Sequence, residues 1–116
     1  MLRARGVAFV FNQWSDGTAL DFQLDQPGCW TAPFAAARLL TRPGTDYEER
    51  ERQMLPYDRV KEPFPEAQAA AQRMVAEAAQ HNVRPLFVLF GNKLEGCAPL
   101  SAKQLAEALE AALPEP

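Results

Sequence analysis

The sequence predicts an α+β protein of one domain, with an antiparallel or mixed sheet that begins with an N-terminal β-hairpin and is covered by two amphipathic helices. Three observations lead to this prediction: apolar residues that alternate near the N-terminus, an uninterrupted apolar run at 86–90, and two alanine-rich segments with helical periodicity. The 116 residues correspond to one domain, so we expect a single core over 1–116.

The hairpin is predicted over residues 7 to 24. Apolar side chains recur at every second position from Val7 to Phe11 and again from Leu20 to Leu24, which is the period of a β-strand. Between these runs, Asp16-Gly17 tolerates the dihedral angles of a tight turn. We therefore expect two antiparallel strands, with the first in a central position because it is apolar on both faces.

The segment 29–41 permits two interpretations. Thr31 and Pro33 could cap and begin a helix that continues through the alanines, or the same residues could form a third strand. We favour the strand because it would widen the sheet. Residues 45–63 are strongly polar and are expected to form a long surface excursion, in which Thr45 and Glu48 have the spacing of a helical capping box.

The C-terminal half contains the two predicted helices and a predicted buried strand. Pro65 opens a helix whose inner side is mostly alanine and which ends at His81-Asn82. The run 86–90 is typical of a strand covered on both faces, in the middle of the core. A last helix is expected to begin at Ser101 and to stop at Pro114.

Composition restricts the partners and the compartment. Fifteen acidic and twelve basic residues give a net charge of −3, which disfavours binding to nucleic acid or to a membrane surface. Cys29 and Cys97 are far apart and form no C-x-x-C pattern, so we expect reduced thiols. The N-terminal apolar run is too short and has no cleavage site for a signal peptide, and no run reaches the ~20 apolar residues of a membrane span. These features predict a cytoplasmic protein.

Two segments resemble parts of known families. Asn92-Lys93-Leu94-Glu95 resembles the N-K-x-D element with which small GTPases recognise guanine, and this resemblance implies a nucleotide site. However, Glu95 replaces the aspartate and no glycine-rich phosphate loop is present, so we do not expect nucleotide hydrolysis. The segment from Val83 to the Ser101 helix is similar to the end of a thioredoxin fold. Thioredoxin chemistry requires two vicinal cysteines, and Cys29 stands alone.

The sequence predicts no catalytic set, no metal site and no cofactor. Cys29 would become a nucleophile only if the fold brought His81 beside it, and a surface histidine at a helix end is the simpler interpretation. A zinc site made from Cys29, Cys97 and His81 would lack a fourth ligand. The acidic residues of 45–63 alternate with basic ones, which is typical of a solvated surface.

The candidate binding residues are Trp14, Trp30, Arg38, Arg42 and Tyr47. The tryptophans lie beside turns, and exposed tryptophans are enriched in contact surfaces. We therefore expect a non-catalytic accessory or adaptor protein that binds a protein partner or a second copy of itself. The alternatives are a module that binds single-stranded nucleic acid through the aromatics and the N-terminal arginines, and a thiol-dependent enzyme centred on Cys29.

Overall fold

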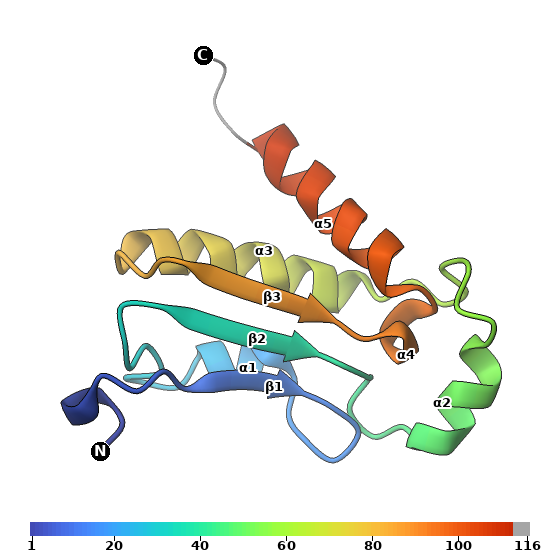
Figure 1. The fold of residues 1–116 in the computed structure, drawn as a ribbon, viewed down its shortest axis with the longest axis horizontal. Helices are drawn as coiled ribbons and strands as arrows, with labels where there is room; N and C mark the ends of the chain where they lie inside the picture. Colours follow the sequence, from blue (N-terminus) through green and yellow to red (C-terminus); the bar gives the residue numbers. More distant parts are fainter. Residues whose placement is uncertain (113–116) are drawn as a thin grey trace.

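The three strands of the sheet all run in the same direction. The computed structural model describes residues 1–112, and in it β1 (Val10–Gln13), β2 (Ala35–Leu39) and β3 (Leu86–Phe90) pair in the order β1-β2-β3. Both pairings are parallel, with Val10 beside Ala36 and Ala36 beside Phe87. All three strands therefore end at one edge of the sheet, which we call the carboxyl edge (Figure 1).

The predicted hairpin is wrong, because residues 20–24 form a helix, α1 (Leu20–Leu24), and not a strand. Leu20 and Leu24 are four residues apart, so both are buried on one face of this helix. The side chain of Gln23 accepts a hydrogen bond from the Asn12 N–H and donates one to the Asn12 carbonyl, both at 3.0 Å. The side-chain amide of Gln23 thus bonds to the N–H and carbonyl of Asn12. In the predicted hairpin, the second strand would have bonded to these groups. The sheet is consequently neither antiparallel nor mixed.

The connections between the strands cross the same face of the sheet. α1 lies between β1 and β2 in the chain, and α3 (Pro65–Gln80) lies between β2 and β3. Because the strands follow one another in space as in sequence, crossovers of one hand place both helices on one side. α5 (Ala98–Ala112) joins this layer through contacts with α3 and β3. In Figure 1, α1 and α3 lie behind the sheet.

The core lies between the sheet and this helix layer, and many of its members are small. Its buried residues are Phe11, Leu20, Leu24, Ala35, Ala37, Leu39, Ala67, Ala70, Ala71, Met74, Ala78, Val83, Leu94 and Leu105. The alanine face predicted for the helix that Pro65 opens is confirmed, and the helix ends before His81 as expected. Helices and strands thus share one compact α+β unit.

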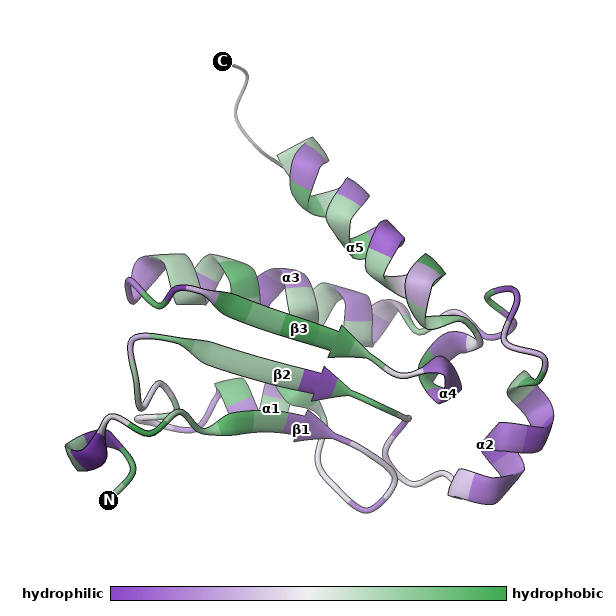
Figure 2. Cartoon of the chain, viewed as in Figure 1, coloured by the Kyte–Doolittle hydropathy of each residue, from purple (hydrophilic) through white to green (hydrophobic). Residues whose placement is uncertain are grey.

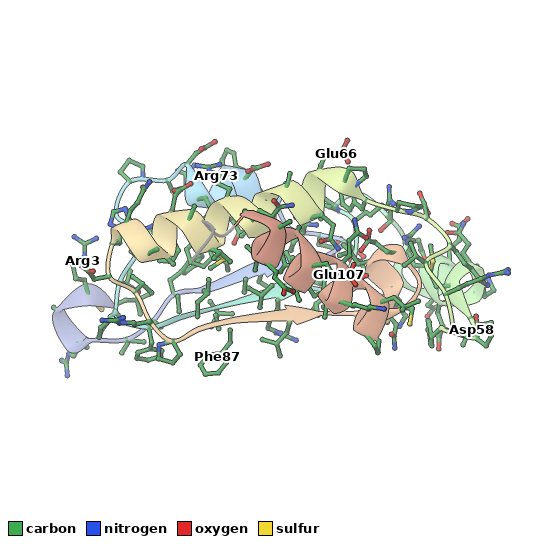
Figure 3. All side chains as sticks on the ribbon, turned by 90° about the horizontal axis from the view of Figure 1, so that it is seen from above. Arg3, Asp58, Glu66, Arg73, Phe87 and Glu107 are labelled. Carbon is green, nitrogen blue, oxygen red and sulfur yellow. The ribbon has the colours of Figure 1, made fainter. Side chains whose placement is uncertain are left out.

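The predicted strand at 86–90 is present, but its predicted burial on both faces is wrong. β3 is an edge strand, and Phe87 and Leu89 are 55% and 51% exposed. Seen from above, Phe87 points away from the side on which the helices lie (Figure 3). No element within residues 1–112 covers that side of the sheet, because both crossovers pass over the other one.

The remaining segments are short. Of the two interpretations of 29–41, the strand is the one observed, over Ala35–Leu39.

The excursion 45–63 contains α2 (Tyr47–Met54), which is capped by the Asp46 carboxylate on the Glu49 N–H and not by a Thr45 capping box. A 3-10 helix, η1 (Arg3–Arg5), precedes the sheet, and α4 (Asn92–Glu95) follows β3.

α5 differs from its predicted bounds. It begins at Ala98, where the Asn92 side chain accepts from the Ala98 N–H at 2.8 Å, so Ser101 is an interior residue of the helix and not its cap. The predicted stop at Pro114 lies outside the described residues. The described helices include none that is both long and apolar enough to cross a lipid bilayer.

Candidate functional site

The face of the sheet that carries no helices is apolar and exposed, and we call it the open face. Its large side chains are Val10 on β1 and Phe87 and Leu89 on β3, with the smaller Ala36 between them on β2. Parallel sheets are almost always covered on both faces. Large exposed apolar surfaces are typical of the sites at which proteins contact other molecules.

A cationic side chain lies on the open face near the carboxyl edge. Arg38, on the central strand, is in register with Asn12 on one side and Leu89 on the other. It is exposed and forms no ion pair with any residue from 1 to 112. Figure 2 shows β3 apolar along its length, whereas β1 becomes hydrophilic toward the carboxyl edge and β2 carries one hydrophilic segment near its end. The open face is therefore apolar with a positive charge at one end.

Beside Arg38, the carboxyl edge contains a cavity of about 350 Å³, which we call the edge cavity. Its lining residues come from β2, the loops after β2 and β3, α4, α2 and the α2–α3 loop: Arg38, Leu40, Tyr47, Tyr57, Gly91, Asn92 and Lys93. Gly91 is required here because a Cβ atom at this position would lie 2.9 Å from the Leu40 carbonyl oxygen. This close approach brings the loops after β2 and β3 together around the cavity.

The edge cavity has a positive electrostatic character. The Lys93 Nζ atom lies 3.4 Å from the centre of the Tyr47 ring, a cation–π contact. Partial burial opposes the charged form of Lys93, but a hydrogen bond with Tyr47 and the nearby Tyr57 and Glu51 outweigh it, so the pKa of Lys93 is raised. Lys93 is therefore protonated at neutral pH. No carboxylate is among the lining residues.

The two tryptophans predicted as binding residues lie at opposite ends of the sheet. Trp14 follows β1 at the carboxyl edge, where its indole packs over Gly17. Trp30 precedes β2 at the other end and is stacked on His81 with ring centroids 5.8 Å apart. A cavity of about 610 Å³ beside Trp30 and His81 is open and includes Arg3, whose guanidinium donates to the Trp30 carbonyl. The tryptophans therefore form no common surface.

Arg42 contacts other parts of the same chain. Its guanidinium donates to the carbonyls of Glu62 and Pro63 at 2.7 and 2.8 Å and lies 4.3 Å from the centre of the Phe64 ring. It also pairs with the Glu62 carboxylate at 3.3 Å. These contacts attach the segment before α3 to the end of β2.

Arg38 and Tyr47 are the two predicted binding residues that the structure brings together, in the edge cavity. The sequence reasoning missed the residues that complete the cavity and the open face: Val10, Tyr57, Phe87, Leu89, Asn92 and Lys93. Asn92 and Lys93 directly follow a strand, and a prediction of parallel strands would have placed them at the carboxyl edge. The run at 86–90 is apolar at every position, so it gives no signal of which side is exposed.

Glu95 does not occupy the position that a base-binding carboxylate would need. It is fully buried, and its carboxylate accepts from the Phe64 N–H at 2.9 Å and from the Gln68 side chain at 3.0 Å. The side chain thus points into the interior and not into the edge cavity. The resemblance of Asn92-Lys93-Leu94-Glu95 to the guanine-recognition element does not extend to the geometry.

Cys29 is not placed as an activated nucleophile. Burial, together with the negative charge of Glu77, raises the pKa of its thiol. The thiol lies 3.7 Å from the Leu24 carbonyl and borders an apolar cavity of about 220 Å³ that His81 does not line. The ring of His81 stacks on Trp30. The charges of Arg73 and Arg3 lower the pKa of the thiol, but burial and Glu77 outweigh them, so the thiol is not activated.

Comparison with known proteins finds no matching family model, no similar curated protein and no similar solved structure. Within residues 1–112, no three histidine, cysteine, aspartate or glutamate side chains gather as a metal site would require. Inferences about function therefore start from the open face and the edge cavity.

Proposed function

We propose that this chain is a non-catalytic protein-binding module, and that a partner covers its open face. The observation that supports the proposal is the exposure of Val10, Phe87 and Leu89 on an all-parallel sheet. Removing such side chains from water is favourable by about 25 cal/mol for each Å² of apolar surface. A partner that fills this face would gain that free energy without unfolding any part of the chain.

The shape of the face favours an α-helix as the covering element. Ala36 lies in register between the larger Val10 and Phe87, so the side chain on the central strand is smaller than its neighbours on either side. Helices are the elements that normally cover the faces of parallel sheets. We propose an amphipathic helix whose apolar stripe packs against this face and whose carboxylate pairs with Arg38.

The charge of Arg38 disfavours a second copy as the occupant. In a two-fold symmetric dimer the same patch lies on both sides of the interface. Two open faces packed together would bring two Arg38 side chains into one apolar interface, where like charges repel. A partner with an acidic residue opposite Arg38 gives the complementary arrangement.

The test compares open-face variants with a matched variant on the other side of the sheet. In Phe87→Ser/Leu89→Ser the open face loses its main apolar groups, whereas Phe22→Ser removes an equally exposed aromatic from α1. Each protein would be immobilised and exposed to native lysate, and the captured proteins would be quantified by mass spectrometry. We expect a captured protein to be reduced at least tenfold by the double variant and by Arg38→Glu, but not by Phe22→Ser.

Identical capture by the wild-type chain and the open-face variants would contradict the proposal. Dimerisation of the wild-type chain that the double variant abolishes would assign the face to a second copy. Sedimentation of the purified chain over a range of concentrations detects that outcome directly.

A further inference from the structure

We propose that the edge cavity is a binding site for a small phosphate monoester, a function separate from protein binding on the open face. Two cationic groups, the Arg38 guanidinium and the Lys93 ammonium, line one concave surface. Tyr47, Tyr57 and Asn92 also line the cavity, and the Asn92 side-chain oxygen is already engaged by the Ala98 N–H. The chain as a whole has a net charge of −3, yet no acidic side chain lines this cavity.

The cavity lies at the carboxyl edge of the sheet. In open α/β sheets, ligands occupy crevices outside the carboxyl ends of the strands where the strand order reverses. The order β1-β2-β3 contains no reversal, so this cavity shares the edge but not the switch point of such sites. The edge cavity lies where β2 and β3 end, and its volume of about 350 Å³ is within the range of small-molecule sites. Leu40 and the tyrosine rings provide an apolar wall for an organic group attached to the phosphate.

One of the two cations, the Lys93 ammonium, is held in place before any ligand arrives. The Tyr47 ring lies directly beneath the Lys93 ammonium group. The Lys93 carbonyl is fixed by two hydrogen bonds from the buried Arg50, at 3.1 and 2.9 Å. Tyr57, which also lines the cavity, has a φ of 64°, a left-handed conformation that a bulky residue rarely adopts. A site whose groups are already ordered binds with a smaller entropic loss.

The donor set suits a phosphate better than a carboxylate. A guanidinium can bind two oxygens of one phosphate side by side, and an ammonium can bind the third as a compact point charge. A carboxylate has two oxygens, so it could satisfy only one of these cations fully. The dianionic charge of a phosphate monoester also matches the two positive charges.

The proposal is tested by titrating the ¹⁵N-labelled full chain with phenyl phosphate, with phenol as the ligand that lacks the anion, and with benzoate as the carboxylate. We expect saturable amide shifts at Gly91, Asn92 and Lys93 with phenyl phosphate and none with phenol. Lys93→Gln and Arg38→Gln should each weaken binding at least tenfold. Lys103→Gln, which removes an exposed lysine from α5, should leave binding unchanged.

Shifts that do not saturate, or a Kd unchanged in both cavity variants, would overturn the proposal. Tighter binding of benzoate than of phenyl phosphate would overturn the assignment to phosphate. Lys93→Gln separates this site from the open face, because Lys93 lies outside that face. Conversely, Phe87→Ser/Leu89→Ser should bind phenyl phosphate as the wild-type chain does, even where protein capture is lost.

Discussion

The buried guanidinium of Arg50 donates to the main-chain carbonyl of Lys93 through both Nε and Nη2, at 3.1 and 2.9 Å. Nη2 also donates to the Leu94 carbonyl at 2.9 Å, and Nη1 pairs with the Glu62 carboxylate. The Arg50 side chain of α2 thereby bonds to backbone carbonyls of α4 and orders this short helix, which carries Lys93. This arrangement attaches the polar excursion to the end of the sheet.

Arg50→Met is expected to lower the free energy of unfolding by about 2 to 4 kcal/mol, because the buried carbonyls would lose their donors and methionine supplies none. Urea denaturation followed by circular dichroism measures the change. Arg52→Met on the same helix is the matched control, because Arg52 is exposed, and its effect should stay within about 0.5 kcal/mol. A loss below about 1 kcal/mol for Arg50→Met would show that water replaces these hydrogen bonds.

Glu62 should make stability depend on pH. A hydrogen bond from Arg50, helped by the charges of Arg50 and Arg42, lowers the pKa of Glu62 against the opposing effect of partial burial. The unfolded chain therefore takes up this proton at a higher pH than the folded chain, so the stabilisation is complete above the usual pKa and is lost as pH falls.

The measurement is the urea midpoint of the wild-type chain and of Glu62→Gln between about pH 3 and pH 6. The wild-type chain should be the more stable at the upper end, and its advantage should shrink toward the lower end. Two curves that stay parallel throughout would contradict the role assigned to Glu62.

The spacing of apolar residues along the sequence was enough to predict the longest helix and the last strand. α3 starts at Pro65 and ends before His81, where proline and the loss of the alanine pattern indicate its limits. The strand at 86–90 is equally clear as an element. Its exposure was not predictable, because whether a neighbouring element covers a strand depends on the path of the whole chain.

The direction of the strands could not be predicted because it depends on residues 20–24. Apolar side chains at Leu20 and Leu24 fit one face of a strand and one face of a helix equally well. The choice is made by hydrogen bonds between residues far apart in sequence: Gln13 accepts from the Leu20 N–H at 2.9 Å, and Gln23 pairs with the backbone of Asn12. Nothing in a periodic pattern reveals such contacts.

Only part of the candidate site was predicted, because the direction of the strands was not known. Arg38 and Tyr47 were identified, but Trp14 and Trp30 were grouped with them because each lies beside a turn, and the structure places the two tryptophans at opposite ends of the sheet. Lys93 was considered only as part of the resemblance of residues 92–95 to a guanine-recognition element. Once all strands run one way, the residues that follow them meet at one edge, and Lys93 becomes a neighbour of Arg38.

Gly96→Ala should destabilise the chain strongly. Gly96 has a φ of 125°, and a Cβ atom there would lie 2.5 Å from the Arg59 carbonyl oxygen and 2.8 Å from the Lys61 nitrogen. Both neighbours are backbone atoms and cannot move aside, so we expect a loss of about 3 kcal/mol or more.

The matched control is Gly44→Ala, because Gly44 has a φ of 81° but nothing within 4 Å of an added Cβ. It should cost only the conformational strain, about 1 to 2 kcal/mol. Thermal unfolding of both variants separates strain from collision. Equal losses of stability in the two variants would mean that the backbone around Gly96 shifts to accommodate the added Cβ atom.

Cys29 should react slowly with iodoacetamide at neutral pH. Its raised pKa, due to burial and to Glu77, leaves almost no thiolate there, so the rate should rise only above the usual thiol value of about 8.5. Cys97→Ser isolates the reaction of Cys29, and the same variant in urea gives the rate of an ordinary thiol. A rate that reaches its plateau near pH 7 would instead support a thiol-dependent enzyme.

Alanine is abundant where β2 packs against the helix layer, and this part of the core therefore does not tolerate larger side chains. Ala37 and Ala71 are fully buried, and Ala35, Ala67 and Ala70 nearly so. A tightly packed site of this kind has no room for further methyl groups, so enlarging any of these residues to valine forces the layers apart at a cost of about 1 to 3 kcal/mol. Homologous chains should therefore keep the distance between these two layers constant.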